Sequence, residues 1–243
     1  MDEGKDHILL GTQPFYDLDI ITRPPTLIPR WETEEWTSRL VDLLRPDWTQ
    51  HQPKRRRILD VCTGTGCIAL ALAAHLPNDS TEIVGLDIST QAIQLANDNL
   101  KSHEQLLEET GNKVRFQLED IYQPHVEQHF FRDAPLDLVV SNPPYVTHTE
   151  YASLDPDVKQ WEDRQALVAD LQGTQLHRRL IQLVSHWKRS YGRQVASDLP
   201  TLVMEIGGAH QVPVLQQELD HHGFNNVKVW KDLAGKDRVV LAT

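Results

Sequence analysis

The stretch ILDVCTGTG, residues 58–66, decides the fold of this chain. Its apolar first half is typical of a buried strand, and its glycines allow the backbone to approach a ligand closely. The apolar residues that follow, 67–75, predict a helix whose N-terminus presents free N–H groups. Because a strand, a glycine loop and a helix begin a nucleotide-binding βαβ unit, the stretch predicts an α/β fold.

Two acidic residues narrow the ligand that this unit can bind. A second strand, 82–87, ends in Asp87, about 20 residues beyond the glycine loop, where a carboxylate can accept both hydroxyls of a ribose. Asp60 at the end of the first strand would repel a pyrophosphate, and the loop lacks the full GxGxxG pattern of dinucleotide-binding proteins. An acid there suits an ammonium or sulfonium group better.

The alternation of helices and strands continues to the same edge of the sheet. A helix over 90–102 precedes a strand over 114–118, after which Asp120 either accepts a hydrogen bond from an adenine amine or is an ordinary loop acid. A fourth strand, 136–140, leads to Asn142. Open α/β sheets bind ligands at the carboxyl ends of their strands, so all four strand ends are expected to face one crevice.

The segment SNPPY, residues 141–145, ends that fourth strand abruptly. A residue before proline avoids the helical region, so Asn142 is presented on a stiff, extended backbone. Its amide oxygen and the carbonyl of Pro143 are two acceptors that suit an NH2 group on a planar carbon, and Tyr145 could stack on that plane. A glutamine amide and the exocyclic amine of a base both fit this description, whereas the simpler interpretation is an Asn-Pro turn.

The remaining segments are read from periodicity and from turn residues. Residues 8–22 predict a hairpin, and a helical stripe beginning near Trp36 is expected to stop at Pro46. Residues 46–54 and 123–135 are expected to be loops biased toward Pro, His and Gln, and 146–172 a long polar loop that acts as a lid. The basic run 54–57 is expected to be a solvated strand entrance. The last elements expected are helices over 173–191 and 210–222 and strands over 201–206, 226–230 and 238–242.

Composition favours one large α/β domain. The chain has 243 residues and a formal net charge of -11, which disfavours a nucleic acid as a general partner. Its two cysteines, Cys62 and Cys67, form no CxxC pair, and the 12 histidines are scattered, so no metal site is expected. No stretch approaches the roughly 18 apolar residues of a membrane span, and the N-terminus resembles neither a signal peptide nor a transit peptide.

These motifs together resemble the HemK/PrmC family of protein-(glutamine-N5) methyltransferases, which methylate the GGQ glutamine of class I release factors. The resemblance covers nearly the whole chain. It is carried by LIPRWETE (27–34, the family's LIPRPETE), DVCTGTG (60–66), Asp87, NPPY (142–145), EIG (205–207) and KDLAGKDRV (231–239). It implies a class I methyltransferase fold, a Rossmann-like, seven-stranded, mostly parallel sheet with helices on both faces, with S-adenosyl-L-methionine as donor and no metal.

The matched positions imply the roles of particular residues. Gly64 and Gly66 would back the methionine part of the donor, Asp87 would hold its ribose and Asp120 would lie by its adenine. The predicted donor-binding set is Asp60, Thr63, Gly64, Gly66, Asp87, Ile88, Asp120 and Asn142. The predicted catalytic residues are Asn142, Pro143 and Tyr145, and these three with Pro144 form the predicted substrate site.

The chain also departs from the family's pattern. Cys62 replaces a glycine and Trp31 a proline, and residues 161–163 and 169–170 of the lid differ as well. The family carries a helical N-terminal domain that helps to hold the release factor, and this chain begins after it, so we expect either a truncated chain or a different mode of docking. The domains expected are a hairpin and linker over 1–26 and a catalytic domain over 27–243.

The partner expected is the GGQ loop of a class I release factor, bound by a monomer without membrane or nucleic acid. The mitochondrial matrix is the preferred compartment, and the cytoplasm is the alternative. Two other functions stay open: methylation of an exocyclic amine of DNA or RNA, and a non-catalytic scaffold of the same fold. The intact residues Asp60, Gly64, Gly66, Asp87 and Asn142 argue against the scaffold.

Overall fold

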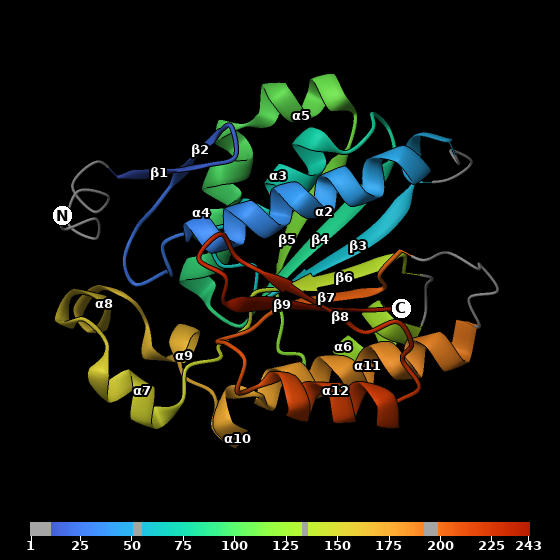
Figure 1. Cartoon of the computed structure of the whole chain (residues 1–243). Helices are drawn as coiled ribbons and strands as arrows, with labels where there is room; N and C mark the ends of the chain where they lie inside the picture. The colour runs from blue at the N-terminus through green and yellow to red at the C-terminus, as the bar shows by residue number, and fades with distance from the viewer. Residues whose placement is uncertain (1–10, 51–54, 133–135, 192–198) are drawn as a thin grey trace.

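The computed structural model describes residues 11–50, 55–132, 136–191 and 199–243. Its centre is a sheet of seven strands in the order β5-β4-β3-β6-β7-β9-β8 (Figure 1). The strands are β3 (Arg56–Val61), β4 (Thr81–Asp87), β5 (Lys113–Leu118), β6 (Leu138–Ser141), β7 (Leu202–Glu205), β8 (Lys228–Lys231) and β9 (Asp237–Ala242). Among these strands, β9 runs antiparallel to both of its neighbours, β7 and β8, and the other adjacent pairs are parallel. The predicted class I methyltransferase fold is confirmed.

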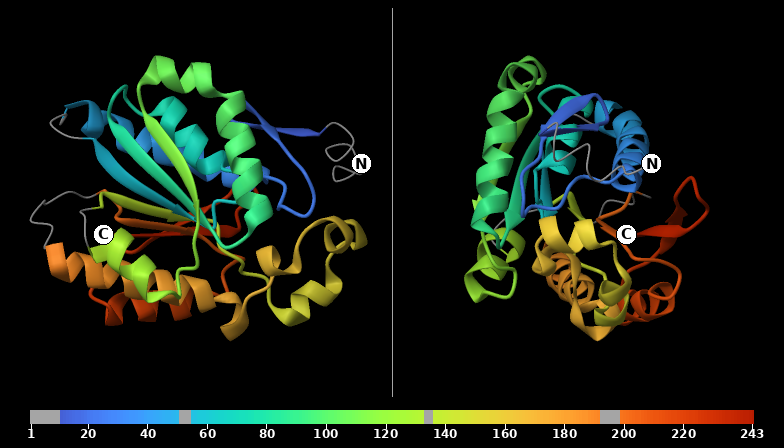
Figure 2. Two further views of the ribbon diagram at one scale, coloured as in Figure 1. Left: turned by 180° about the vertical axis from the view of Figure 1, so that it is seen from behind. Right: turned by 90° about the vertical axis from the view of Figure 1, so that its left-hand side faces the viewer.

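Helices cover both faces of this sheet because successive side chains of a strand point to opposite faces. Ile58 packs into a core with the helices α2 (Trp31–Gln50), α3 (Cys67–His75), α4 (Thr90–Ser102) and α5 (Glu104–Thr110). Leu59 packs into a second core with α11 (Gln175–Tyr191) and α12 (Val212–His221). In the left view of Figure 2 the helices of the first core lie above the sheet, and α11 and α12 lie below it.

The hairpin at the start of the described chain joins the first of these cores. It consists of β1 (Thr12–Phe15) and β2 (Leu18–Ile21), paired antiparallel, and the expected residues 8–10 lie outside the described residues. Phe15 and Ile20 are fully buried against the layer of α2 and α3. The division of the chain at residues 26 and 27 stays a prediction.

The expected end of helix α2 at Pro46 is wrong, because the helix continues to Gln50 with Pro46 inside it. A proline in a helix loses one backbone hydrogen bond and crowds the preceding turn. Burial of the next turn offsets this cost, since Trp48 is 2% exposed and lies under the guanidinium of Arg56, 5.6 Å from the ring centroid. Tertiary packing here outweighs the local preference. Residues 51–54 of the expected loop lie outside the described residues.

The expected loop over 123–135 is also helical where it is described. A short helix α6 (Pro124–Val126) leads into a π-helix, η1 (Glu127–Arg132), and residues 133–135 lie outside the described residues. Val126, Phe130 and Phe131 are buried in the second core, which explains why a segment rich in His and Gln is ordered.

The expected lid over 146–172 is not a plain loop, because it folds into short helices. These are α7 (His148–Ser153), α8 (Pro156–Trp161), α9 (Arg164–Leu167) and α10 (Asp170–Gly173). The side chains of Thr147, Asp155 and Asp163 cap the first three. These caps stabilise helices that have no apolar stripe to pack on a core. Helices of four to six residues are too short to show a periodicity, so the sequence did not predict them.

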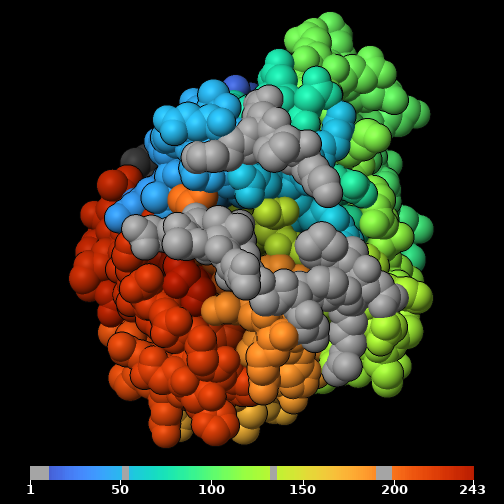
Figure 3. Space-filling model, turned by 90° about the vertical axis from the view of Figure 1, so that its right-hand side faces the viewer, coloured from blue at the N-terminus to red at the C-terminus, as the bar shows by residue number. Residues whose placement is uncertain are grey.

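The molecule therefore has two different ends. Where the parallel strands begin, α2 lies above α12 on the surface (Figure 3). Where they end, the short helices of residues 146–172 lie next to the sheet (Figure 1). The predicted site residues follow the strands at this second end. No helix among the described residues has both the length and the apolar composition needed to cross a membrane.

Candidate active site

A cavity of about 390 Å³ lies at the carboxyl ends of β3, β4, β5 and β6. Each of these four strand ends contributes at least one predicted donor-binding residue to the lining: Gly64, Asp87, Ile88, Asp120 and Asn142. Pro144 of the predicted substrate site lines it too. Other parts of its wall include residues 25–27 and, from the segment of the short helices, Asp163, Gln165, Ala166 and Val168. Its size is that of pockets for small molecules.

The two glycines of the loop have different surroundings. Gly64 faces the cavity with φ +56°, and no heavy atom lies within 4 Å of the place that a Cβ would occupy. Gly66, with φ +81°, is packed on Phe116, where a Cβ would come within 2.6 Å of Cζ. Gly66 does not line the cavity, so it is required first by the packing of the loop onto β5.

Asp60 and Thr63 lie beneath the glycine loop and not in the cavity wall. Asp60 is fully buried, and its Oδ2 accepts a hydrogen bond of 2.6 Å from Oγ1 of Thr63. Its Oδ1 has no hydrogen-bond partner among the described residues. Burial raises the pKa of Asp60 to about 7, against the lowering effect of the Thr63 hydroxyl. A buried carboxylate oxygen without a partner calls for a donor or a cation.

Asp87 ties the second strand to the glycine loop. Its Oδ2 accepts from the backbone N–H of Gly64 at 2.9 Å, and its Oδ1 accepts from that of Ser89 at 2.9 Å. Burial raises the pKa of Asp87, and these two backbone bonds oppose the shift. Each carboxylate oxygen can accept a second hydrogen bond, so the group retains capacity for a ligand hydroxyl.

The far end of the cavity combines apolar and acidic groups. Ile88 is 64% exposed although its side chain is apolar, and it lies in the cavity wall with Tyr122. Asp120 lines the same end, and its Oδ1 accepts from the backbone N–H of Tyr122 at 2.9 Å. A planar ring with an amine suits such a mixture of apolar surface and acceptors.

The NPPY segment reaches the cavity only in part. Asn142 and Pro144 line it, Pro143 is buried, and Tyr145 is not among the lining residues. The ring of Tyr145 packs on Gly207, where a Cβ would lie 3.1 Å from Cδ2. The Asn142 amide nitrogen, Nδ2, donates to Oγ1 of Thr33 at 3.1 Å.

Glu205 joins these groups, although sequence reasoning assigned it no role. It ends β7 with 1% exposure, and its Oε2 accepts from Oγ1 of Thr33 and from Nε1 of Trp36, each at 2.7 Å. Its Oε1 accepts from Oη of Tyr145 at 3.1 Å. Burial raises the pKa of Glu205, and the three donors oppose that shift. Its signals in the sequence are an acid at the end of an apolar strand and its place in the matched EIG motif (205–207).

Polar contacts also close the roof of the cavity. Arg30 donates through Nη2 to both carboxylate oxygens of Glu162, at 2.6 and 2.7 Å, and the Glu162 side chain is 3% exposed. The backbone N–H of Asp163 donates to the carbonyl of Pro25 at 2.8 Å. The segment before α2 and the short helices are thereby fastened to each other over the cavity.

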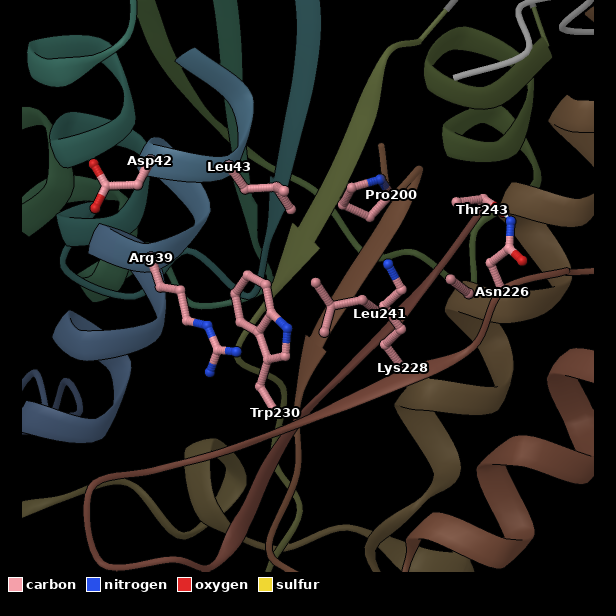
Figure 4. Close-up of a pocket in the computed structure, with 10 residues that line it drawn as sticks. Arg39, Asp42, Leu43, Pro200, Asn226, Lys228, Trp230, Leu241 and Thr243 are labelled. Atoms are coloured by element: carbon pink, nitrogen blue, oxygen red, sulfur yellow. Dashed lines mark hydrogen bonds between the residues drawn. The ribbon is translucent and has the colours of Figure 1, made fainter. Parts of the chain in front are cut away.

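A second hollow, of about 400 Å³, lies away from the strand ends that carry these groups. It is formed by α2, β8 and β9, and Pro200 and Asn226 in its wall precede β7 and β8 (Figure 4). The Arg39 guanidinium carbon lies 4.2 Å from the ring centroid of Trp230. No predicted site residue lines it. Among the described residues, no group of three His, Cys, Asp or Glu side chains could hold a metal ion.

Comparisons with known proteins agree with this geometry. The model of the methyltransferase small domain matches residues 37–155. A Schizosaccharomyces pombe protein named probable MRF1 mitochondrial N(5)-glutamine methyltransferase is 32% identical over 97% of this chain and 74% of its own length. The release factor glutamine methyltransferase of Bacteroides thetaiotaomicron is 34% identical over 96% of this chain and 73% of its own length.

The chain belongs to the release factor glutamine methyltransferase family. This family and its fold imply S-adenosyl-L-methionine as the methyl donor. The solved structure of a human methyltransferase 10 domain containing protein superposes on this chain with a TM-score of 0.62 and 13% identity. The match covers 100% of this chain and 96% of the human one. That likeness supports the class I methyltransferase fold and no more. A Saccharomyces cerevisiae family member, 30% identical, is also named as mitochondrial.

Proposed function

We propose that this chain transfers a methyl group from S-adenosyl-L-methionine to the side-chain amide nitrogen of the glutamine in the GGQ loop of a class I release factor. The observation that carries the proposal is the setting of Asn142. Its Nδ2 is taken by Thr33 at 3.1 Å while its side chain lines the cavity, so its Oδ1 is the atom left to accept from a ligand. An acceptor there suits an NH2 group.

The cavity fits the donor by its chemistry. S-adenosyl-L-methionine carries a methyl group on a positively charged sulfur and, when bound, supplies that group to the acceptor. Asp87 would hold the ribose hydroxyls, while Ile88 and Asp120 would flank the adenine. Gly64 would back the methionine part, with Thr63 and Gly66 shaping the loop from below. Asp60, with its unpartnered buried oxygen, favours a ligand that brings a positive charge.

The acceptor side needs two oxygen atoms and a flat surface. Asn142 Oδ1 and the Pro143 carbonyl would each accept one N–H of the glutamine amide, and Tyr145 and Pro144 would pack against its plane. An amide nitrogen is a poor nucleophile because its lone pair is delocalised. Two acceptors favour a more electron-rich, pyramidal nitrogen as positive charge develops, and the surplus proton leaves to water afterwards. Positioning supplies much of the remaining catalysis.

The names of the relatives support the choice of partner and compartment. Two family members are named mitochondrial MRF1 N(5)-glutamine methyltransferases. We propose that this chain acts on a release factor in the mitochondrial matrix, as a monomer. The net charge of -11 opposes a nucleic-acid substrate.

Mass spectrometry of methyl transfer tests the proposal. A release factor with Gly-Gly-Gln, its Gln→Asn variant and adenine-containing DNA are each incubated with donor and with wild-type or Asn142→Ala protein. We expect methylation of the Gln protein alone and a loss of about 10²–10³ in turnover for Asn142→Ala, as when one oxyanion-hole donor is deleted. Donor affinity should stay unchanged. Methylated DNA, equal methylation of the Asn variant, or undiminished turnover by Asn142→Ala would overturn the proposal.

A further inference from the structure

The buried carboxylate of Glu205 connects two predicted catalytic residues, Asn142 and Tyr145, from behind the cavity wall. Asn142 Nδ2 donates to Thr33 Oγ1 at 3.1 Å, and Thr33 Oγ1 donates to Glu205 Oε2 at 2.7 Å. Tyr145 Oη donates to the other oxygen of the same carboxylate at 3.1 Å. Thr33 is 2% exposed and Glu205 is 1% exposed, so this relay lies out of reach of bulk water.

We propose that Thr33, held by Glu205, is a positioning residue that fixes the Asn142 amide with its oxygen toward the acceptor, and thereby selects a glutamine amide over a carboxylate. This inference rests on the proposed function. It assigns to two motifs, LIPRWETE (27–34) and EIG (205–207), a role in acceptor choice that their positions in the sequence do not suggest.

The direction of the relay follows from the donors that each group carries. The indole N–H of Trp36 can only donate, so Oε2 of Glu205 must be an acceptor. The Thr33 hydroxyl has one hydrogen, and its bond of 2.7 Å to that oxygen uses it. Only lone pairs are then left on Thr33 Oγ1 for Asn142, which must present its NH2 group there. This direction holds for ionised Glu205 and for Glu205 protonated on Oε1, because Oε2 carries no hydrogen in either form.

The consequence for the acceptor is a choice between two shapes of similar size. With Asn142 fixed, its Oδ1 and the Pro143 carbonyl are both acceptors, which match the two N–H groups of an amide and repel a carboxylate. If the amide were free to turn over, its NH2 group could face the cavity and would bind a carboxylate instead. Leaving a buried polar group unpaired weakens binding by about 10-fold to 100-fold, so the relay can decide the selectivity.

The same carboxylate fixes the stacking surface. Tyr145 is held by its hydroxyl on Glu205 and by its ring on Gly207, where a Cβ would lie 3.1 Å from Cδ2. The backbone carbonyl of Tyr145 accepts from Nε2 of Gln211 at 3.0 Å. The Asn142 oxygen and the Tyr145 ring are therefore both positioned by Glu205, which keeps their relative placement constant.

The test compares two matched removals of a hydroxyl from α2. Thr33→Val removes the relay, and Thr33→Ser restores it. Thr37→Val is the control, because Thr37 is also fully buried on the same helix but its Oγ1 donates only to the backbone carbonyl of Thr33 at 2.7 Å. For each protein we would measure kcat and KM for a Gly-Gly-Gln release factor, inhibition by its Gln→Glu variant, and donor affinity by calorimetry.

For Thr33→Val we expect kcat to fall about 10-fold to 100-fold and the preference for Gln over Glu to fall at least about 10-fold. Donor affinity should stay within about twofold of the wild-type value. Thr33→Ser should recover most of the preference for Gln over Glu, and the control Thr37→Val should keep the wild-type preference. Glu205→Gln keeps an acceptor oxygen toward Trp36 and Thr33, so this variant should prefer the Gln protein over the Glu protein more strongly than Thr33→Val does.

The outcomes separate the inference from the function on which it rests. If wild-type protein methylates no Gly-Gly-Gln protein, the proposed function is wrong and the inference is wrong with it. If wild-type protein does so and Thr33→Val keeps the preference for Gln, the inference alone is overturned. A Thr33→Ser protein as poor as Thr33→Val, or a joint loss of donor binding in both, would show a merely structural role and would also overturn it.

Discussion

Gly66→Ala should destabilise the protein for reasons of packing and not of ligand binding. Gly66 has φ +81°, and an added Cβ would lie 2.6 Å from Cζ and 3.1 Å from Cε1 of Phe116, and 3.3 Å from Cβ of Ala96. A non-glycine residue in the left-handed region costs about 1–2 kcal/mol. Overpacking against Phe116, which is 8% exposed, adds about 1–3 kcal/mol. The free energy of unfolding should fall by about 2–5 kcal/mol.

Gly64→Ala is the matched control. Gly64 has φ +56°, but nothing lies within 4 Å of its added Cβ, so only the backbone cost of about 1–2 kcal/mol is expected. Urea unfolding of donor-free protein measures both variants, and the difference isolates the clash. Phe116→Leu should recover part of the stability in the Gly66→Ala background and lower it in the wild type. Equal losses for the two glycine variants, or no coupling with Phe116, would refute the reasoning.

Three further predictions concern the titratable groups of the site. Asp87→Ala should weaken binding of S-adenosyl-L-methionine by about 1.5–3 kcal/mol, and calorimetry with unchanged affinity in a folded variant would contradict the assignment of this residue. The folded pKa of Asp60 is raised from 3.8 to about 7, so the stability that protonation provides is full below pH 3.8 and is lost as pH rises through about 7. Asp60→Asn should therefore flatten the fall of unfolding free energy between pH 4 and 7, by up to about 1.4 kcal/mol per pH unit, and identical slopes would contradict this. Burial raises the pKa of the Cys67 thiol to about 12, and this residue is buried, so a thiol reagent at pH 8 should label Cys67 only as fast as the folded protein opens, which quenched-labelling mass spectrometry can measure.

The expected lid, residues 146–172, is the segment whose structure the local sequence pattern did not predict. Residues 146–172 lack periodicity, and a long loop was the natural prediction. The structure instead builds four short helices, three of them with side-chain caps, and two contacts tie this segment to the opposite wall, Arg30 with Glu162 and Asp163 with Pro25. Such ties join residues 132 positions apart in the case of Arg30, so they leave no trace in the sequence around either partner.

The sequence by itself determined the succession of strands in the sheet, the long helices that follow the glycine loop and the second strand, and the position of Asn142 at a strand end. Each of these follows from short-range rules: apolar runs make strands, glycines free the backbone, and a proline restrains the residue before it. Gly64, Asp87, Ile88, Asp120 and Asn142 all line one cavity, and their roles in binding stay a prediction.

Only the tertiary structure decided which of two similar residues does what. The glycines 64 and 66 differ because β5 brings Phe116 against one of them and leaves the other open. Glu205 became the centre of a buried hydrogen-bond network because folding brings Thr33 and Trp36 to it from 172 and 169 residues away. Hydrogen bonds and packing act over a few ångströms in space, whereas a sequence pattern records only neighbours along the chain, so these contacts could be seen only after the chain had folded.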